Sequence, residues 1–139
     1  MKNDEKQNKL RLVLTAAVLL HLGVVVWHGS SHSHVPVPIT FLQTVFVVIV
    51  IVLLPLIGGG LMWTSLRQFA VWVITLSMFG ALAFGVINHF ILTSPDNIME
   101  VPAHEWRSSF VLSAYLLAVI EALGTIVGVV AIRSWKRTA

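Results

Sequence analysis

The sequence contains no cysteine, and this absence excludes several kinds of site. A chain without thiols forms no disulfide, offers no thiolate to a metal, carries no cysteine nucleophile and lacks the Cys-x-x-Cys-His motif that attaches haem covalently. Any metal in this protein must therefore be held by histidine nitrogens and carboxylate oxygens. Such ligands suit zinc, copper(II) and iron(II).

Charge is also scarce, and hydrophobic runs take its place. Charged residues make up 11% of the 139 residues, against roughly a quarter in soluble domains. The hydrophobic residues gather into four runs of the length, about 20 residues, that crosses about 30 Å of hydrocarbon. The sequence therefore predicts an all-α integral membrane protein whose single domain, 1–139, is an up-down bundle of four transmembrane helices. We place the spans at about 10–27, 39–63, 69–92 and 108–132.

Lysine and arginine are distributed unequally between the two ends of the predicted bundle. Arg107 alone lies beside the connectors that follow the first and third spans. The eight on the other side are Lys2, Lys6, Lys9, Arg11, Arg67, Arg133, Lys136 and Arg137. By the positive-inside rule, both termini lie in the cytoplasm and both histidine-bearing connectors lie outside the plasma membrane. Because the basic residues flank spans, we expect the lipid bilayer and a second copy or other membrane subunits as partners, and no nucleic acid.

Polar residues concentrate in one stretch, 84–110, which ends the third span and begins the fourth. The mixture of imidazoles and carboxylates in this stretch favours a divalent transition metal. The spacing matches no closed motif, since residues 104–107 read His-Glu-Trp-Arg and not His-Glu-x-x-His. The ligands that we predict are His89, Asp96, Glu100 and His104, with His21 of the first span.

The other connector, 28–38, contains glycine, serine and two prolines, a composition that predicts irregular structure. Its histidines, His28, His32 and His34, would then lie on a flexible loop that captures a metal only transiently. His28, at the boundary with the first span, is an alternative to His21 as a ligand.

Three ionisable side chains, His21, His89 and Glu121, fall inside predicted spans, where polar groups cost a few kcal/mol. We therefore predict that they point into the bundle and not into lipid. Glu121 is expected to exchange protons or to hold a ligand in place, and Asn88 is expected to share the second role. Helices in lipid pack through small residues. The packing positions that we predict are Ala81, Gly85, Ala118, Gly124 and Gly128.

These patterns favour a small membrane protein whose outward-opening pocket of histidines and carboxylates binds zinc, copper or iron. It would serve in metal handling or as an accessory to a metalloenzyme. One alternative is a structural or accessory subunit without its own ligand, and another is a proton-coupled small transporter using Glu121. A haem b held by His21 and His89 is the weaker cofactor hypothesis. The sequence has no phosphate-binding glycine loop and no Gly-x-Ser-x-Gly motif, so it identifies no enzymatic reaction.

Overall fold

The computed structural model describes residues 2–136, and within them the protein is helical, without strands. The helices are α1 (Lys2–His34), α2 (Phe41–Phe46), the π-helix η1 (Val47–Leu53), α3 (Leu54–Leu61), α4 (Arg67–Val86), the π-helix η2 (Ile87–Ile91) and α5 (Arg107–Lys136). Four continuous helical segments are long and apolar enough to cross a membrane: Glu5–His34, Phe41–Leu61, Arg67–Ile91 and Arg107–Ser134. The prediction of an all-α chain with four helices long and apolar enough to span a membrane is confirmed.

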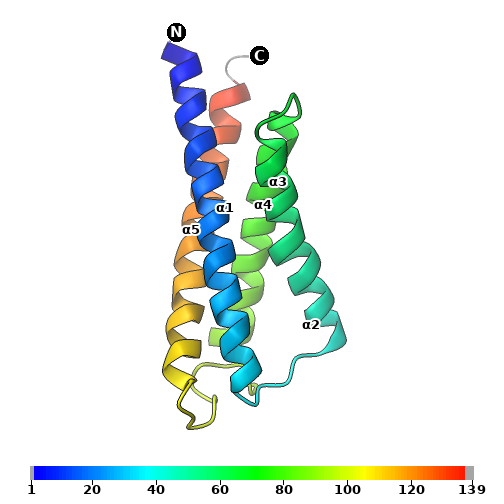
Figure 1. Cartoon of the computed structure of the whole chain (residues 1–139), viewed down its shortest axis with the longest axis vertical. Helices are drawn as coiled ribbons and strands as arrows, with labels where there is room; N and C mark the ends of the chain where they lie inside the picture. The colour runs from blue at the N-terminus through cyan, green and yellow to red at the C-terminus, as the bar shows by residue number, and fades with distance from the viewer. Residues whose placement is uncertain (1, 137–139) are drawn as a thin grey trace.

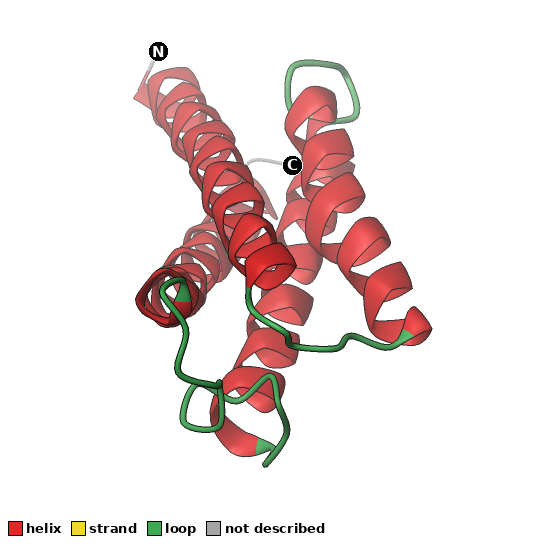
Figure 2. Ribbon diagram, turned by 60° about the horizontal axis from the view of Figure 1, so that its bottom comes forward, coloured by secondary structure: helices red, strands yellow, loops and turns green. Residues whose placement is uncertain are grey.

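The helices form a bundle in which α5 packs along both α1 and α4, and α3 packs along α4. Figure 1 places the start of α1, the end of α5 and the α3–α4 turn at one end of this bundle, and the connectors 35–40 and 92–106 at the other. Figure 2 shows these two connectors from that end. Arg137, one of the basic residues used to predict orientation, lies outside the described residues.

The prediction of an irregular connector from residue 28 is wrong, because α1 continues to His34. Contacts with α5 hold this last part of α1 in the helix despite its glycine and serines. Trp27 Nε1 donates to Ser109 Oγ at 2.7 Å, and the hydroxyls of Ser31 and Ser109 lie 2.9 Å apart. Pro36 follows two residues after the helix ends, as expected of a residue that cannot continue one. Tertiary hydrogen bonds therefore override weak local helix propensity here.

The core is apolar at the end of the bundle where α1 begins and α5 ends. Leu14 and Val18 of α1 meet Ile74 and Met78 of α4 there, all of them buried. Glycines bring the backbones close: a Cβ on Gly58 would lie 2.6 Å from Ile74 Cγ1, and a Cβ on Gly124 would lie 3.3 Å from Met78 Cγ. The small residues of α3 and α5 thus allow these helices to approach α4.

Gly128 provides the tightest of these approaches. A Cβ at this position would overlap the buried side chain of Thr75 on α4. We expect Gly128→Ala to lower the free energy of unfolding by about 1–3 kcal/mol, as overpacking does, measured by titrating the protein in mixed micelles with dodecyl sulfate. Gly23→Ala is the matched control, because nothing lies within 4 Å of its added methyl. Equal stability of the Gly128 variant and wild type would show that α4 and α5 are not packed as described.

Two π-helical stretches lie in the half of the bundle away from the termini. In η1, which ends two residues before Pro55, the N–H of the following residue, Leu54, donates to the carbonyl of Ile49, five residues back. The proline lacks an N–H and its ring crowds the carbonyl four residues earlier, so the preceding turns widen. In η2 the Leu92 N–H donates to Ile87 O at 2.8 Å, again five residues back. Such π segments are rare in proteins, and those that occur often lie at functional sites.

Candidate metal centre

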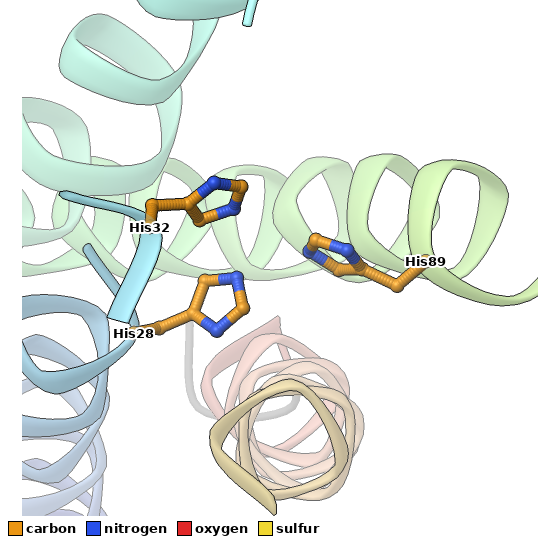
Figure 3. Close-up of side chains that lie close together, drawn as sticks. All are labelled: His28, His32 and His89. Atoms are coloured by element: carbon orange, nitrogen blue, oxygen red, sulfur yellow. The ribbon is translucent and has the colours of Figure 1, made fainter. Parts of the chain in front are cut away.

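Three histidines from two spans meet near the connectors. His28 and His32 are four residues apart on α1, so they lie on the same face of the helix. His89 is supplied by η2. One ligand nitrogen of each ring lies within 4.8 Å of the other two, and Figure 3 shows the three rings turned toward a common space. We call these residues the histidine triad.

All three rings of the triad pack against one aromatic side chain of α5. Phe110 is fully buried, and the centroids of the three imidazole rings lie 4.8–5.5 Å from that of its ring. Around Phe110, apolar residues of both connectors, among them Val35, Val37, Ile98 and Val101, form a second buried cluster. This cluster lies over the end of the bundle, so the triad has apolar surroundings and little contact with water.

Two triad members have one nitrogen hydrogen-bonded to a protein oxygen. The Ser113 hydroxyl donates its single hydrogen to the carbonyls of Ser109, at 2.7 Å, and Phe110, at 3.0 Å, so it accepts the hydrogen of His28 Nδ1, 2.9 Å away. His89 Nδ1 donates to Asp96 O at 2.9 Å. Both rings therefore carry their hydrogen on Nδ1 and leave the lone pair of Nε2 free. Oxygen acceptors orient metal-binding histidines in this way and raise their basicity.

Asp96 brings a carboxylate to the same place. Its Oδ1 lies 3.3 Å from His32 Nε2 and 3.3 Å from His89 Nδ1, although neither contact has hydrogen-bond geometry. This oxygen, His28 Nε2 and His32 Nδ1 are all buried without a hydrogen-bond partner among the described residues. Buried polar atoms are nearly always paired, and a bound ion is one explanation of a group that is not. A cation between the rings would satisfy several of them.

The bend that carries Asp96 is held by its own hydrogen bonds. Asn97 Nδ2 donates to Leu92 O at 2.9 Å, and Ile98 N donates to His89 O at 3.0 Å. Arg107 Nε donates to Val101 O at 3.1 Å from the start of α5. The carboxylate is therefore presented by an ordered backbone that is tied to both neighbouring spans.

The geometry fits a small divalent ion after a modest movement. In tetrahedral zinc sites the metal–nitrogen distance is about 2.0–2.1 Å, which places ligand nitrogens about 3.4 Å apart. The nitrogens of the triad, now up to 4.8 Å apart, would have to approach one another by at most about 1.4 Å, within the reach of side-chain rotation. Three imidazoles also leave a fourth position for Asp96 or for another molecule.

A cavity of about 210 Å³ extends from the triad into the bundle. It is bordered by all four spans, and most of its wall is apolar. At its inner end Glu121 Oε1 lies 3.1 Å from His21 Nε2, and both side chains are buried. The sequence predicted a polar pocket, whereas the structure has an apolar cavity with polar groups at its two ends. Besides the triad and Asp96, the wall includes Val25, Ile39, Gln43, Val47, Ile51, Ala81, Phe84, Gly85, Ala114, Leu117, Ala118 and Glu121.

The structure brings together only part of the predicted ligand set. His89 and Asp96 are joined, but Glu100 and His104 are exposed and lie outside the cluster. His21 pairs with Glu121 and is not a member of the triad. Nε2 of His21 faces that carboxylate, and a haem b held by His21 and His89 stays a prediction.

The predicted supporting residues have varied positions. Asn88 of η2 accepts from Gln43 Nε2 at 3.0 Å, which ties α2 to η2, and it donates to Phe84 O of α4 at 2.8 Å. Gly124 and Gly128 are buried against α4. Ala81, Gly85 and Ala118 instead border the cavity.

Sequence reasoning missed His28 and His32 as a pair, because it assigned them to a loop. The available signal was their spacing of four residues directly after an apolar run, which on a helix gives two ligands on one face. It also missed the roles of Ser113 and Phe110, which depend on how α1 and α5 are aligned.

Comparisons of the chain with protein-family models, with curated proteins and with solved structures found no match.

Proposed function

We propose that this protein binds a divalent transition metal ion at the histidine triad, with Asp96 beside it. The observation that carries the proposal is the convergence of three enclosed imidazoles, with one nitrogen of each within 4.8 Å of the others. Two further features support it: the oxygen acceptors that orient His28 and His89, and the unpaired buried oxygen of Asp96. Neutral imidazoles with a carboxylate suit zinc, copper(II) and iron(II).

The site is proposed to serve metal handling on the extracytoplasmic side of the plasma membrane, or to support a metalloenzyme there. The excess of lysine and arginine at the end that carries the termini supports an up-down bundle with both termini in the cytoplasm. The connectors at the opposite end (Figure 1), and the triad at the ends of α1 and η2 beside them, would then face outward. An activity reporter fused to the C-terminus and found active outside the cytoplasm would overturn this orientation.

The direct test is metal stoichiometry. We expect detergent-purified protein, stripped with chelator and offered zinc, to retain close to one ion per chain after gel filtration, measured by elemental analysis. Cobalt(II) should occupy the same site and give the visible absorption of a tetrahedral histidine complex, which zinc then abolishes. His104→Ala is the matched control, because it removes an exposed histidine outside the triad and should leave the stoichiometry unchanged.

A wild-type protein that stays empty after zinc, copper(II) and iron(II) are offered would refute the proposal. Two alternatives would then gain. One is a subunit of a larger membrane complex without its own ligand, for which co-purification of a partner is the test. The other is proton-coupled transport, which the buried His21–Glu121 pair at the inner end of the cavity supports. Intramembrane carboxylates commonly serve such a role.

A further inference from the structure

We infer that the cavity beside the triad binds a lipid-soluble aromatic ring with hydroxyl groups at opposite ends, as in a hydroquinone. One hydroxyl would face the metal centre and the other would face Glu121. The inference rests on the proposed function for the metal end of the ligand only. It names the class of molecule that this site would hold next to its ion.

The cavity has the size and the apolar lining that suit an aromatic ring. An apolar cavity of about 150 Å³ lined by Leu, Ile and Phe is known to bind benzene. The cavity here is larger, about 210 Å³, and Phe84, Val47, Ile51 and Leu117 contribute apolar wall. A six-membered ring with small substituents therefore fits, whereas a bulky or charged molecule does not.

The polar groups of the cavity wall lie apart from one another. The triad and Asp96 border one end of the cavity, and Glu121 borders the other. Between them α5 contributes Ala114, Leu117 and Ala118, and Glu121 lies about 10 Å beyond Ala114 along the helix. Ligand pockets typically combine apolar walls with a few placed polar groups that orient the ligand. Polar groups at two opposite ends select a flat apolar body with a polar atom at each end.

The glycine at position 85 keeps these two ends connected. A Cβ there would make ordinary contacts, 3.8 Å from Glu121 Oε2 and 3.9 Å from His89 Cδ2. A side chain larger than that of alanine would therefore occupy the space between the carboxylate and the triad. Gly85 itself borders the cavity. Both π-helices border it as well, through Val47 and Ile51 of η1 and His89 of η2. Rare π geometry on two sides of one cavity is consistent with a functional site.

The arrangement of α1 and α2 favours entry of a ligand into the cavity from the bilayer. No residue of α2 is buried, and α1 and α2 diverge toward the connectors in Figures 1 and 2. The cavity reaches both helices, through Val25 and Gly29 of α1 and Gln43 of α2. The end of the bundle is covered by the apolar cluster around Phe110. A ligand that arrives through lipid, between α1 and α2, therefore meets less packed protein than one that arrives from water.

The test measures binding of radiolabelled decylhydroquinone, under argon, to zinc-loaded protein in lipid nanodiscs, with empty nanodiscs subtracted. We expect saturable binding to one site. Ala118→Phe, which fills the cavity from α5, should weaken it about tenfold or more, the change that roughly 1.4 kcal/mol produces. Ala81→Leu fills the cavity from α4 and should act in the same direction. Ala16→Phe, on an exposed part of α1, should bind like wild type.

The zinc content of each sample separates the possible failures. A filling variant that retains its zinc is folded at the site, so unchanged binding in both such variants would overturn the inference. Equal binding of decylbenzene, which lacks the hydroxyls, would also overturn it. If the wild type retains no zinc but binds decylhydroquinone, and the filling variants lose that binding, the cavity ligand is upheld and the metal site is refuted. Tighter binding of untailed hydroquinone than of the decyl form would identify a water-borne source and contradict entry through lipid.

Discussion

Replacing Glu121 with leucine should lower the free energy of unfolding by about 1–3 kcal/mol, because it leaves His21 buried without its partner. Glu121 Oε1 is 3.1 Å from His21 Nε2, and the other ring nitrogen, Nδ1, already has no hydrogen-bond partner among the described residues. His21 is fully buried, and the cavity beside the pair is lined mostly by apolar side chains, so no nearby polar side chain replaces the lost carboxylate. The measurement is a dodecyl sulfate titration of the purified protein in mixed micelles.

The double variant His21→Leu, Glu121→Leu distinguishes a mutual contact from two independent effects. Replacement of both members of a buried pair by apolar residues is often neutral or stabilising, so the double variant should be more stable than either single one. Glu121→Gln keeps an acceptor for His21 and should cost only about 1 kcal/mol. Leu123→Ala, at an exposed position of the same helix, controls for general effects on α5. Additive single changes would show that the two side chains do not interact.

The membrane architecture could be predicted because its cause is visible in the sequence. A run of apolar residues long enough to cross hydrocarbon has no other stable form than a helix. The same reasoning placed His21, His89 and Glu121 inside the bundle, and the structure buries all three. Their exclusion from lipid depends on their own chemistry and on no particular neighbour.

The composition of the triad depends on neighbours, and here local patterns were misleading. Gly29 and the serines after it predict a loop, but Trp27 and Ser31 bond to Ser109 and keep α1 helical. Only as a result do His28 and His32 lie one turn apart on a helix, as a pair of candidate ligands. Asp96 reaches the triad through a bend whose path is set by backbone hydrogen bonds, and such paths are not encoded in residue spacing.

Small residues were ambiguous for a different reason. An alanine or glycine on a helix permits either a close approach of another helix or an empty space. Gly128 has the first role, against Thr75, whereas Gly85 and Ala118 have the second and border the cavity. The choice is made by the angle at which the spans cross, which the composition of a single span does not determine.

Alanine substitution of Ser113 should lower zinc affinity about 10–100-fold although it removes no ligand. The Ser113 hydroxyl accepts the hydrogen of His28 Nδ1, which directs the lone pair of Nε2 toward the triad. Without that acceptor, His28 can rotate or carry its hydrogen on the nitrogen that should bind the metal. Affinity is measured by competition with a chromophoric zinc chelator.

The comparison across positions makes this prediction specific. Thr125→Val removes another hydroxyl of α5, which donates to Glu121 O on the same helix, and should leave affinity unchanged. His28→Ala, His32→Ala and His89→Ala each delete a proposed ligand and should weaken binding more than Ser113→Ala does. Equal zinc affinity of the Ser113 and Thr125 variants would mean that Ser113 does not orient a ligand. A normal affinity in any of the three histidine variants would remove that residue from the site, because a ring that holds the ion cannot be deleted without loss.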